Sequence, residues 1–134
     1  MMQSHQQSRK VMIVDDHDDF RASVGRLIRS WGHEVAVASD GASALSLADA
    51  FQPECGILDV SMPGMNGLDL ARRMRQRFPP AQLYLIALSG HEDAAVRERC
   101  LEAGFDEYLL KPADIALLER LLGGDRPDSR AASH

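Results

Sequence analysis

The chain has 134 residues, of which 45% are hydrophobic and 26% charged, and its net charge is −5. This length fits one domain with a single core. The negative charge argues against direct binding of nucleic acid or anionic lipid by this chain. No apolar run is long enough to cross a bilayer, and the polar segment from Met1 to Ser8 lacks the apolar stretch of a signal peptide.

The two cysteines and five histidines give little support for a disulfide or a zinc site. Cys55 and Cys100 lie far apart in apolar segments and are interpreted as reduced core residues. The histidines form no ligand-spaced pair of the kind that zinc sites use. We therefore expect a reducing, cytoplasmic setting.

The first half of the chain alternates apolar segments of strand length with segments of helical spacing. Residues 10–14 form a short apolar run that ends in acid and predicts a buried strand. Apolar residues from Phe20 to Trp31 recur at helical spacing, and Gly32 follows as a C-cap. Residues 34–38 predict a second strand, and Asp40 is a candidate N-cap for the next helix.

The same alternation continues through the second half of the chain. Three further strands are predicted at 55–59, 83–88 and 108–110. Three helices follow them: one capped by Asn66 with Leu68, Ala71, Met74 and Phe78 on its inner face, one from Asp93 to Ala103, and one lined by Ile115, Leu118, Leu121 and Leu122. Strands and helices in alternation predict an α/β fold, in which a parallel sheet is covered on both faces. We expect a polar tail at 1–9, one domain at 10–122 and a disordered tail at 123–134.

Polar side chains collect where the predicted strands end. The first strand is followed by Asp15 and Asp16, the third ends in Asp59, and the fourth and fifth are followed by Ser89 and Lys111. In an open parallel sheet, ligands bind outside the carboxyl ends of the strands. Any one of these groups alone has a structural interpretation as a turn or a cap. Together at one sheet edge, they predict a site for a metal ion and a phosphate.

The chemistry of three neighbouring carboxylates supports this prediction. Carboxylates brought together repel one another, and a divalent cation removes that conflict. Mg²⁺ prefers oxygen ligands and keeps positions for water and phosphate. A carboxylate that remains accessible can attack phosphorus and form an acyl phosphate. Lys111 and Ser89 could then bind the charged phosphoryl oxygens.

Four segments, in this order along the chain, carry a resemblance to a known family: Val14-Asp15-Asp16, Asp59-Val60-Ser61-Met62-Pro63-Gly64-Met65-Asn66-Gly67, Ala87-Leu88-Ser89-Gly90 and Gly104 to Pro112. Together they resemble the receiver (phosphoacceptor) domain of two-component response regulators, over residues 10–122. The resemblance implies a flavodoxin-like, doubly wound sheet of five parallel strands in the order 2-1-3-4-5. The strand order is taken from the family.

The resemblance also implies roles for the residues at the strand ends. Asp59 matches the residue that a partner histidine kinase phosphorylates. Asp16 and Asp59 match the direct Mg²⁺ ligands, with the backbone carbonyl of Ser61 as a third ligand and Asp15 acting through water. Lys111 matches the lysine that contacts the phosphoryl group.

Further positions match parts of the family's switch. Ser89 matches a hydroxyl that moves toward the phosphoryl group, and Tyr108 matches an aromatic residue that turns inward behind it. Ser61 and His91 match positions that flank the phosphate and tune its hydrolysis. The bond before Pro112 is expected to be cis.

The chain departs from the family pattern at two places. Ser89 stands where threonine is commoner in the family. Serine keeps the hydroxyl but lacks the methyl group that restricts side-chain rotation in threonine. Cys55-Gly56 occupies a stretch that is usually larger and aliphatic. Glycine weakens a strand and leaves less to pack, so we expect looser packing at Gly56.

The implied partners are a sensor histidine kinase or a histidine phosphotransfer protein, and an output partner on the face of the fourth helix, fifth strand and fifth helix. A homodimer formed on phosphorylation is left open, and so is the choice between a stand-alone regulator and a fragment of a larger one. We expect no enzymatic activity beyond self-phosphorylation and slow self-dephosphorylation.

The sequence leaves two alternative functions open. One is a receiver fold that binds partners without phosphorylation. All the acidic and lysine positions of the phosphorylation site are present in this chain, which argues against this alternative. The other is a Mg²⁺-dependent phosphohydrolase with an aspartyl-phosphate intermediate. That chemistry resembles the haloacid dehalogenase type, which places a general acid two residues after the nucleophile. Ser61 stands there and cannot serve as an acid at neutral pH.

Overall fold

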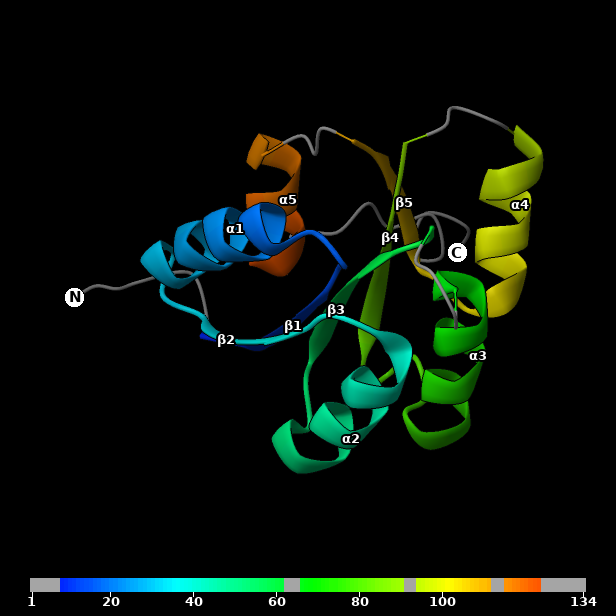
Figure 1. The fold of residues 1–134 in the computed structure, drawn as a ribbon, viewed down its shortest axis with the longest axis horizontal. Helices are drawn as coiled ribbons and strands as arrows, with labels where there is room; N and C mark the ends of the chain where they lie inside the picture. The colour runs from blue at the N-terminus through cyan, green and yellow to red at the C-terminus, as the bar shows by residue number, and fades with distance from the viewer. Residues whose placement is uncertain (1–7, 62–65, 91–93, 112–114, 124–134) are drawn as a thin grey trace, which may run out of the picture.

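The computed structural model describes residues 8–61, 66–90, 94–111 and 115–123. Within these ranges strands and helices alternate along the chain (Figure 1). Their bounds are β1 Lys10–Val14, α1 Asp18–Ser30, β2 Glu34–Ala38, α2 Gly41–Phe51, β3 Cys55–Asp59, α3 Gly67–Arg77, β4 Tyr84–Ser89, α4 Ala94–Ala103, β5 Glu107–Leu110 and α5 Ile115–Leu122. The predicted α/β alternation is confirmed.

The five strands form one parallel sheet in the order β2-β1-β3-β4-β5, which confirms the strand order that the resemblance implies. Val14 at the end of β1 pairs with Leu58, and Ser89 at the end of β4 pairs with Leu110. Because the strands run in one direction and end in register, the residues that follow them meet at one edge of the sheet.

The core has two parts, one on each face of the sheet. Successive strand residues point to opposite faces, so Met12 packs with α2, α3 and α4, while Ile13 packs with α1 and α5. Figure 1 shows the same division, with α1 and α5 together on one side of the strands. Every residue of β3 and β4 is buried, which explains why these strands have continuous rather than alternating apolar sequences.

The helix ends follow the local sequence signals. The side chain of Asp40 accepts a hydrogen bond from the Ser43 amide at 2.8 Å, and Asn66 does the same for the Asp69 amide at 2.9 Å. Gly104 ends α4 with a φ of +116°, a conformation that favours glycine. These caps confirm the predicted starts of α2 and α3 and the end of α4.

Some helical faces differ from the prediction. In α3 the predicted inner-face residues Ala71 and Met74 are fully buried, but Leu70, which was not predicted, is fully buried as well, and Leu68 is only partly buried. Ile115 was expected on the inner face of α5, but it is 41% exposed. Ile115 is the first residue of that helix, and Leu118, one turn later, is fully buried in the core instead.

The expectation of looser packing at Gly56 is wrong. A Cβ atom there would lie 2.9 Å from Leu85 Cδ2 and 3.3 Å from Leu58 Cδ1. These leucines fill the space that a larger residue would occupy, so the glycine is part of a tightly packed sheet face. Among the residues described, no helix combines the length and apolar character needed to cross a membrane.

Candidate functional site

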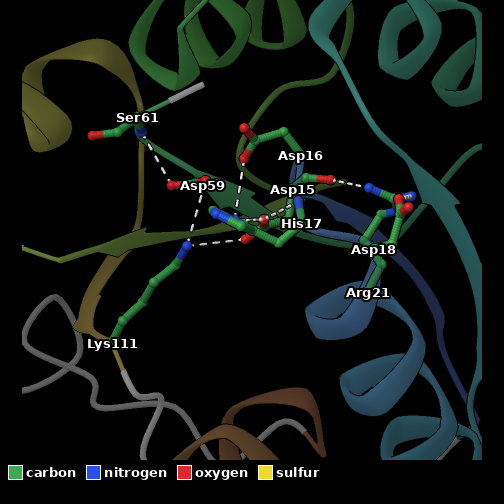
Figure 2. Close-up of polar contacts among 8 residues, drawn as sticks. All are labelled: Asp15, Asp16, His17, Asp18, Arg21, Asp59, Ser61 and Lys111. Atoms are coloured by element: carbon green, nitrogen blue, oxygen red, sulfur yellow. Dashed lines mark hydrogen bonds and ion pairs between the residues drawn. The ribbon is translucent and has the colours of Figure 1, made fainter. Parts of the chain in front are cut away.

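The residues predicted for the site do gather at the carboxyl edge of the sheet (Figure 2). Asp15 follows β1, Asp59 is the last residue of β3, and Lys111 follows β5. Asp15 and Asp59 are buried, while the neighbouring Asp16 is partly exposed. Ser61, two residues after Asp59, is exposed. The parallel register, and not closeness in sequence, brings these groups together.

Lys111 links the two buried acids. Its Nζ lies 3.1 Å from Asp15 Oδ2 and 3.4 Å from Asp59 Oδ2. Burial by itself lowers the pKa of Lys111, but the hydrogen bond to Asp15 and the charge of Asp59 outweigh burial and raise it. The ammonium also lies 5.2 Å from the centre of the Phe20 ring, a cation–π contact. Lys111 is therefore a positioned, charged group.

The two carboxylate oxygens of Asp59 have different surroundings. Oδ1 accepts a hydrogen bond from the Ser61 amide at 3.1 Å. Oδ2 is buried and accepts no hydrogen bond from the described part of the chain, although Lys111 Nζ makes an ion pair with it. Burial is the main cause that raises the pKa of Asp59, and the charge of Asp15 adds to it. A buried oxygen in this state lacks a partner that a bound ion or phosphoryl group would supply.

His17 is the site residue that sequence reasoning missed. Its backbone amide and its ring Nδ1 contact Asp15 Oδ1 at 2.8 and 2.9 Å, and Nδ1 lies 3.3 Å from Asp16 Oδ1. The hydrogen bond to Asp15, followed by the charge of Asp16, raises the pKa of His17. The available signal was its position directly after the Asp15-Asp16 pair.

Arg21, from the first turns of α1, holds the backbone of the acidic loop. Its guanidinium donates to the carbonyl oxygen of Asp15 at 2.6 Å and pairs with Asp18. The peptide that joins Asp15 to Asp16 is therefore anchored to the helix. This contact was not predicted either, because nothing in the local sequence distinguishes Arg21 from other surface arginines.

A cation would fit between the acids. Asp15, Asp16, His17 and Asp59 each offer one donor atom, and these four atoms lie within 4.8 Å of one another. Three of the donors are carboxylate oxygens, the ligand type that Mg²⁺ prefers. Lys111 balances only part of their charge, and Asp59 Oδ2 accepts no hydrogen bond from the residues that the structure describes. The donor set and the state of this oxygen both suit a divalent cation.

The two predicted switch residues lie on neighbouring strands. Ser89 is buried at the end of β4, and its carbonyl accepts a hydrogen bond from the Lys111 amide at 2.8 Å. Tyr108 is buried in β5 and pairs with Ala87, two residues before Ser89. The register therefore puts both side chains on the same sheet face. His91 and Pro112 lie outside the described residues, as does the segment 62–65.

The sequence of the chain is similar to those of response regulators. A family model for the response regulator receiver domain matches residues 11–122. The transcriptional regulatory protein PrrA of Mycobacterium tuberculosis is 38% identical over 83% of this chain and 47% of PrrA. The nitrate/nitrite response regulator NarL of Escherichia coli K12 is 34% identical over 81% of this chain and 50% of NarL. The chain spans about half the length of these curated relatives.

Solved structures agree with the sequence comparisons. The receiver domain of the sensor histidine kinase PA1611 from Pseudomonas aeruginosa PAO1 is 28% identical, with a TM-score of 0.76 over 87% of this chain and 95% of that chain. In that protein a magnesium ion is coordinated in the active site cleft. With the family match over residues 11–122, the sheet order and the acidic edge, this chain belongs to the response regulator receiver domains.

Proposed function

We propose that this receiver domain is a phosphorylation-dependent switch whose phosphoryl group is carried by Asp59. The donor is the phosphohistidine of a sensor histidine kinase or of a histidine phosphotransfer protein, in a cytoplasmic setting. The observation that carries the proposal is the state of Asp59 Oδ2. It is buried, accepts no hydrogen bond from the described residues, and faces Lys111 at 3.4 Å.

In the transfer step, Asp59 Oδ2 attacks phosphorus and the bond from phosphorus to the donor histidine nitrogen breaks. The carboxylate must be ionised to attack. Burial opposes ionisation, and the ammonium of Lys111 favours it. Lys111 can then bind one phosphoryl oxygen, and the hydroxyl of Ser89 can donate to another. No side chain has to transfer a proton, because a carboxylate attacks and an imidazole nitrogen leaves.

Mg²⁺ is the proposed cofactor of this step. Asp16, Asp59 and the backbone carbonyl of Ser61 would hold it directly, and Asp15 would act through water. When bound, the cation neutralises negative charge on the phosphoryl oxygens. The three clustered acids support this assignment.

Phosphorylation would change the output surface through Ser89 and Tyr108. The added charge and acceptor oxygens attract the Ser89 hydroxyl, and Tyr108 on the same sheet face responds to the space left behind it. The proposed output face comprises α4, β5 and α5. In α4 only Cys100 and Ala103 are buried, so this helix has few core contacts to resist displacement.

The geometry favours this switch over the two alternatives. A docking module that works without phosphorylation would have no need for Lys111 to contact both Asp15 and Asp59. A phosphohydrolase needs a general acid near the leaving group, and Ser61 at that position cannot act as one. The proposed chemistry is therefore limited to the domain's own phosphorylation and slow dephosphorylation.

The test is labelling with a small phosphodonor, such as acetyl phosphate, in the presence and absence of Mg²⁺. We expect Mg²⁺-dependent incorporation into the wild type and none into Asp59→Asn. Asp18→Asn is the matched control, because Asp18 is a nearby aspartate whose side chain is 88% exposed. Equal labelling of the wild type and Asp59→Asn would contradict the proposal.

A further inference from the structure

The ring of His17 points at the acids of the site although most of it is exposed. The side chain is 67% exposed, yet Nδ1 lies 2.9 Å from Asp15 Oδ1 and 3.3 Å from Asp16 Oδ1. Figure 2 shows the His17 side chain beside Asp15 and Asp16, with dashed lines from it to both carboxylates. The roles proposed above for Asp15, Asp16, Asp59 and Lys111 make no use of this nitrogen.

The spacing of the four donor atoms is close to that of a single coordination sphere. Two ligands of one ion are separated by at most twice the bond length, about 4.2 Å for bonds of about 2.1 Å. The donor atoms of Asp15, Asp16, His17 and Asp59 all lie within 4.8 Å of one another. Since Asp16 and His17 are the more exposed members, a small rotation of their side chains can close the remaining gap.

The kind of donor decides which ion such a sphere prefers. Mg²⁺ selects oxygen ligands, whereas an imidazole nitrogen suits Zn²⁺, Ni²⁺ and Cu²⁺. Asp59 supplies an independent indication of a ligand, because its buried Oδ2 is directed into the cluster and accepts no hydrogen bond from the described residues. A nitrogen donor therefore lies in the same cluster as a buried oxygen that makes an ion pair with Lys111 at 3.4 Å.

We propose that Nδ1 of His17 is a fourth metal ligand of this site. With this ligand, the site binds a transition-metal ion such as Zn²⁺ in competition with Mg²⁺. The proposal rests on the metal cluster of the proposed function. Without a metal, Nδ1 carries a hydrogen, because the carboxylates that it contacts can only accept one. Metal binding would require the tautomer with its hydrogen on Nε2, so the ring would lose the Nδ1 proton to solvent and gain one from solvent at Nε2.

Transition-metal binding has a consequence for the switch. A Mg²⁺ ion held by two carboxylates leaves coordination positions for water and phosphate. In the four-ligand arrangement, the His17 ring takes one of these positions, on the exposed side of the cluster. Zn²⁺ therefore lowers the rate of phosphorylation of Asp59, and it does so only while His17 is present.

The experiment is calorimetric titration of the metal-free full chain with Zn²⁺ and, separately, with Mg²⁺. The variant is His17→Ala, whose exposed position lets the fold persist, which circular dichroism checks. We expect Zn²⁺ affinity to fall about tenfold or more, the scale found when a metal ligand's support is removed. Mg²⁺ affinity should change by less than about twofold, because the oxygen ligands remain.

The matched control is His33→Asn, which removes a histidine at the opposite, amino-terminal end of the sheet and should bind both ions as the wild type does. An equal loss of Zn²⁺ and Mg²⁺ affinity in His17→Ala would overturn the proposal, because His17 would then only hold Asp15 in place. Unchanged affinity for both ions would overturn it as well. The proposed function is tested separately, because it concerns Mg²⁺-dependent labelling of the wild type, without Zn²⁺, and its loss in Asp59→Asn.

Discussion

The two ends of the sheet each contain a buried cluster of charges, and the clusters differ in how well they are satisfied. At the amino end, Arg75 of α3 pairs with Asp106 at 2.6 Å, and both side chains are largely buried. Arg75 also donates to the carbonyls of Gly104 at 2.8 Å and Leu83 at 2.6 Å. The Leu85 amide donates to the same Asp106 carboxylate at 2.8 Å.

At the carboxyl end, one lysine contacts two of three clustered aspartates, and Asp59 Oδ2 accepts no hydrogen bond from the described residues. The Arg75 cluster pairs one cation with one anion, and its donors and acceptors match. The Asp59 cluster has an excess of negative charge. A cluster whose charges and hydrogen-bond groups are all paired contributes to the stability of the fold. A cluster with excess charge is typical of a binding site, where a ligand supplies the missing partner. The variants below test this difference.

The largest expected effect is at the amino end. Arg75→Met leaves the largely buried Asp106 side chain without its cation and removes donors from two part-buried carbonyls, so the free energy of unfolding should fall by about 3 kcal/mol. Urea denaturation measures this change. The control is Arg72→Met on the same helix, whose side chain is 54% exposed and should cost less than about 0.5 kcal/mol. Similar losses in the two variants would contradict the role given to the Arg75 cluster.

At the carboxyl end, removing a charge should increase the free energy of unfolding and not decrease it. Asp59→Asn relieves repulsion with Asp15 and removes a charge whose burial is unfavourable, so the metal-free protein should gain about 1 kcal/mol. Adding Mg²⁺ should raise the melting temperature of the wild type more than that of the variant, because only the wild type has the full ligand set. A destabilised Asp59→Asn protein without metal would show that the cluster supports the fold.

A smaller effect concerns His33, at the amino end. Its Nδ1 accepts a hydrogen bond from the Arg9 amide at 3.1 Å, and burial, together with the charge of Arg9, lowers the pKa of His33 from 6.5. The unfolded chain therefore binds a proton more readily than the folded one. The stability from neutral His33 is present above pH 6.5 and is lost as the pH falls through the lowered pKa. In His33→Asn, which can keep the acceptor, the free energy of unfolding should depend less on pH there.

The smallest effect concerns His17, whose pH dependence has the opposite sign. Its pKa is raised, so its contribution to stability is present below pH 6.5 and is lost as the pH rises through the raised pKa. The exposed position of the ring keeps this contribution small. NMR titration of the ring in the metal-free protein should give a pKa above that of a model peptide, and in Asp16→Asn the pKa should move back toward it. A ring pKa that does not respond to Asp16→Asn would contradict the contact.

Local patterns in the sequence account for most of the fold. The strands β1, β3 and β4 can be predicted from their apolar runs alone, because a strand buried on both faces is apolar throughout. The caps at Asp40 and Asn66 follow from hydrogen bonds that span three residues. The placement of Asp59 and Lys111 at one edge follows from the direction of parallel strands. The strand order came from the family resemblance and not from these patterns.

Only the tertiary structure decided the contacts between distant parts of the chain. Lys111 and Asp15 are 96 residues apart, and Arg75 and Asp106 are 31 apart, so no local period connects them. The sequence by itself determined which groups stand at the strand ends. The tertiary structure decided that one oxygen of Asp59 accepts no hydrogen bond from the described residues and that the ring of His17 turns toward the acids. Periodicity records which face of an element is buried, whereas partners across the sheet depend on how the elements pack.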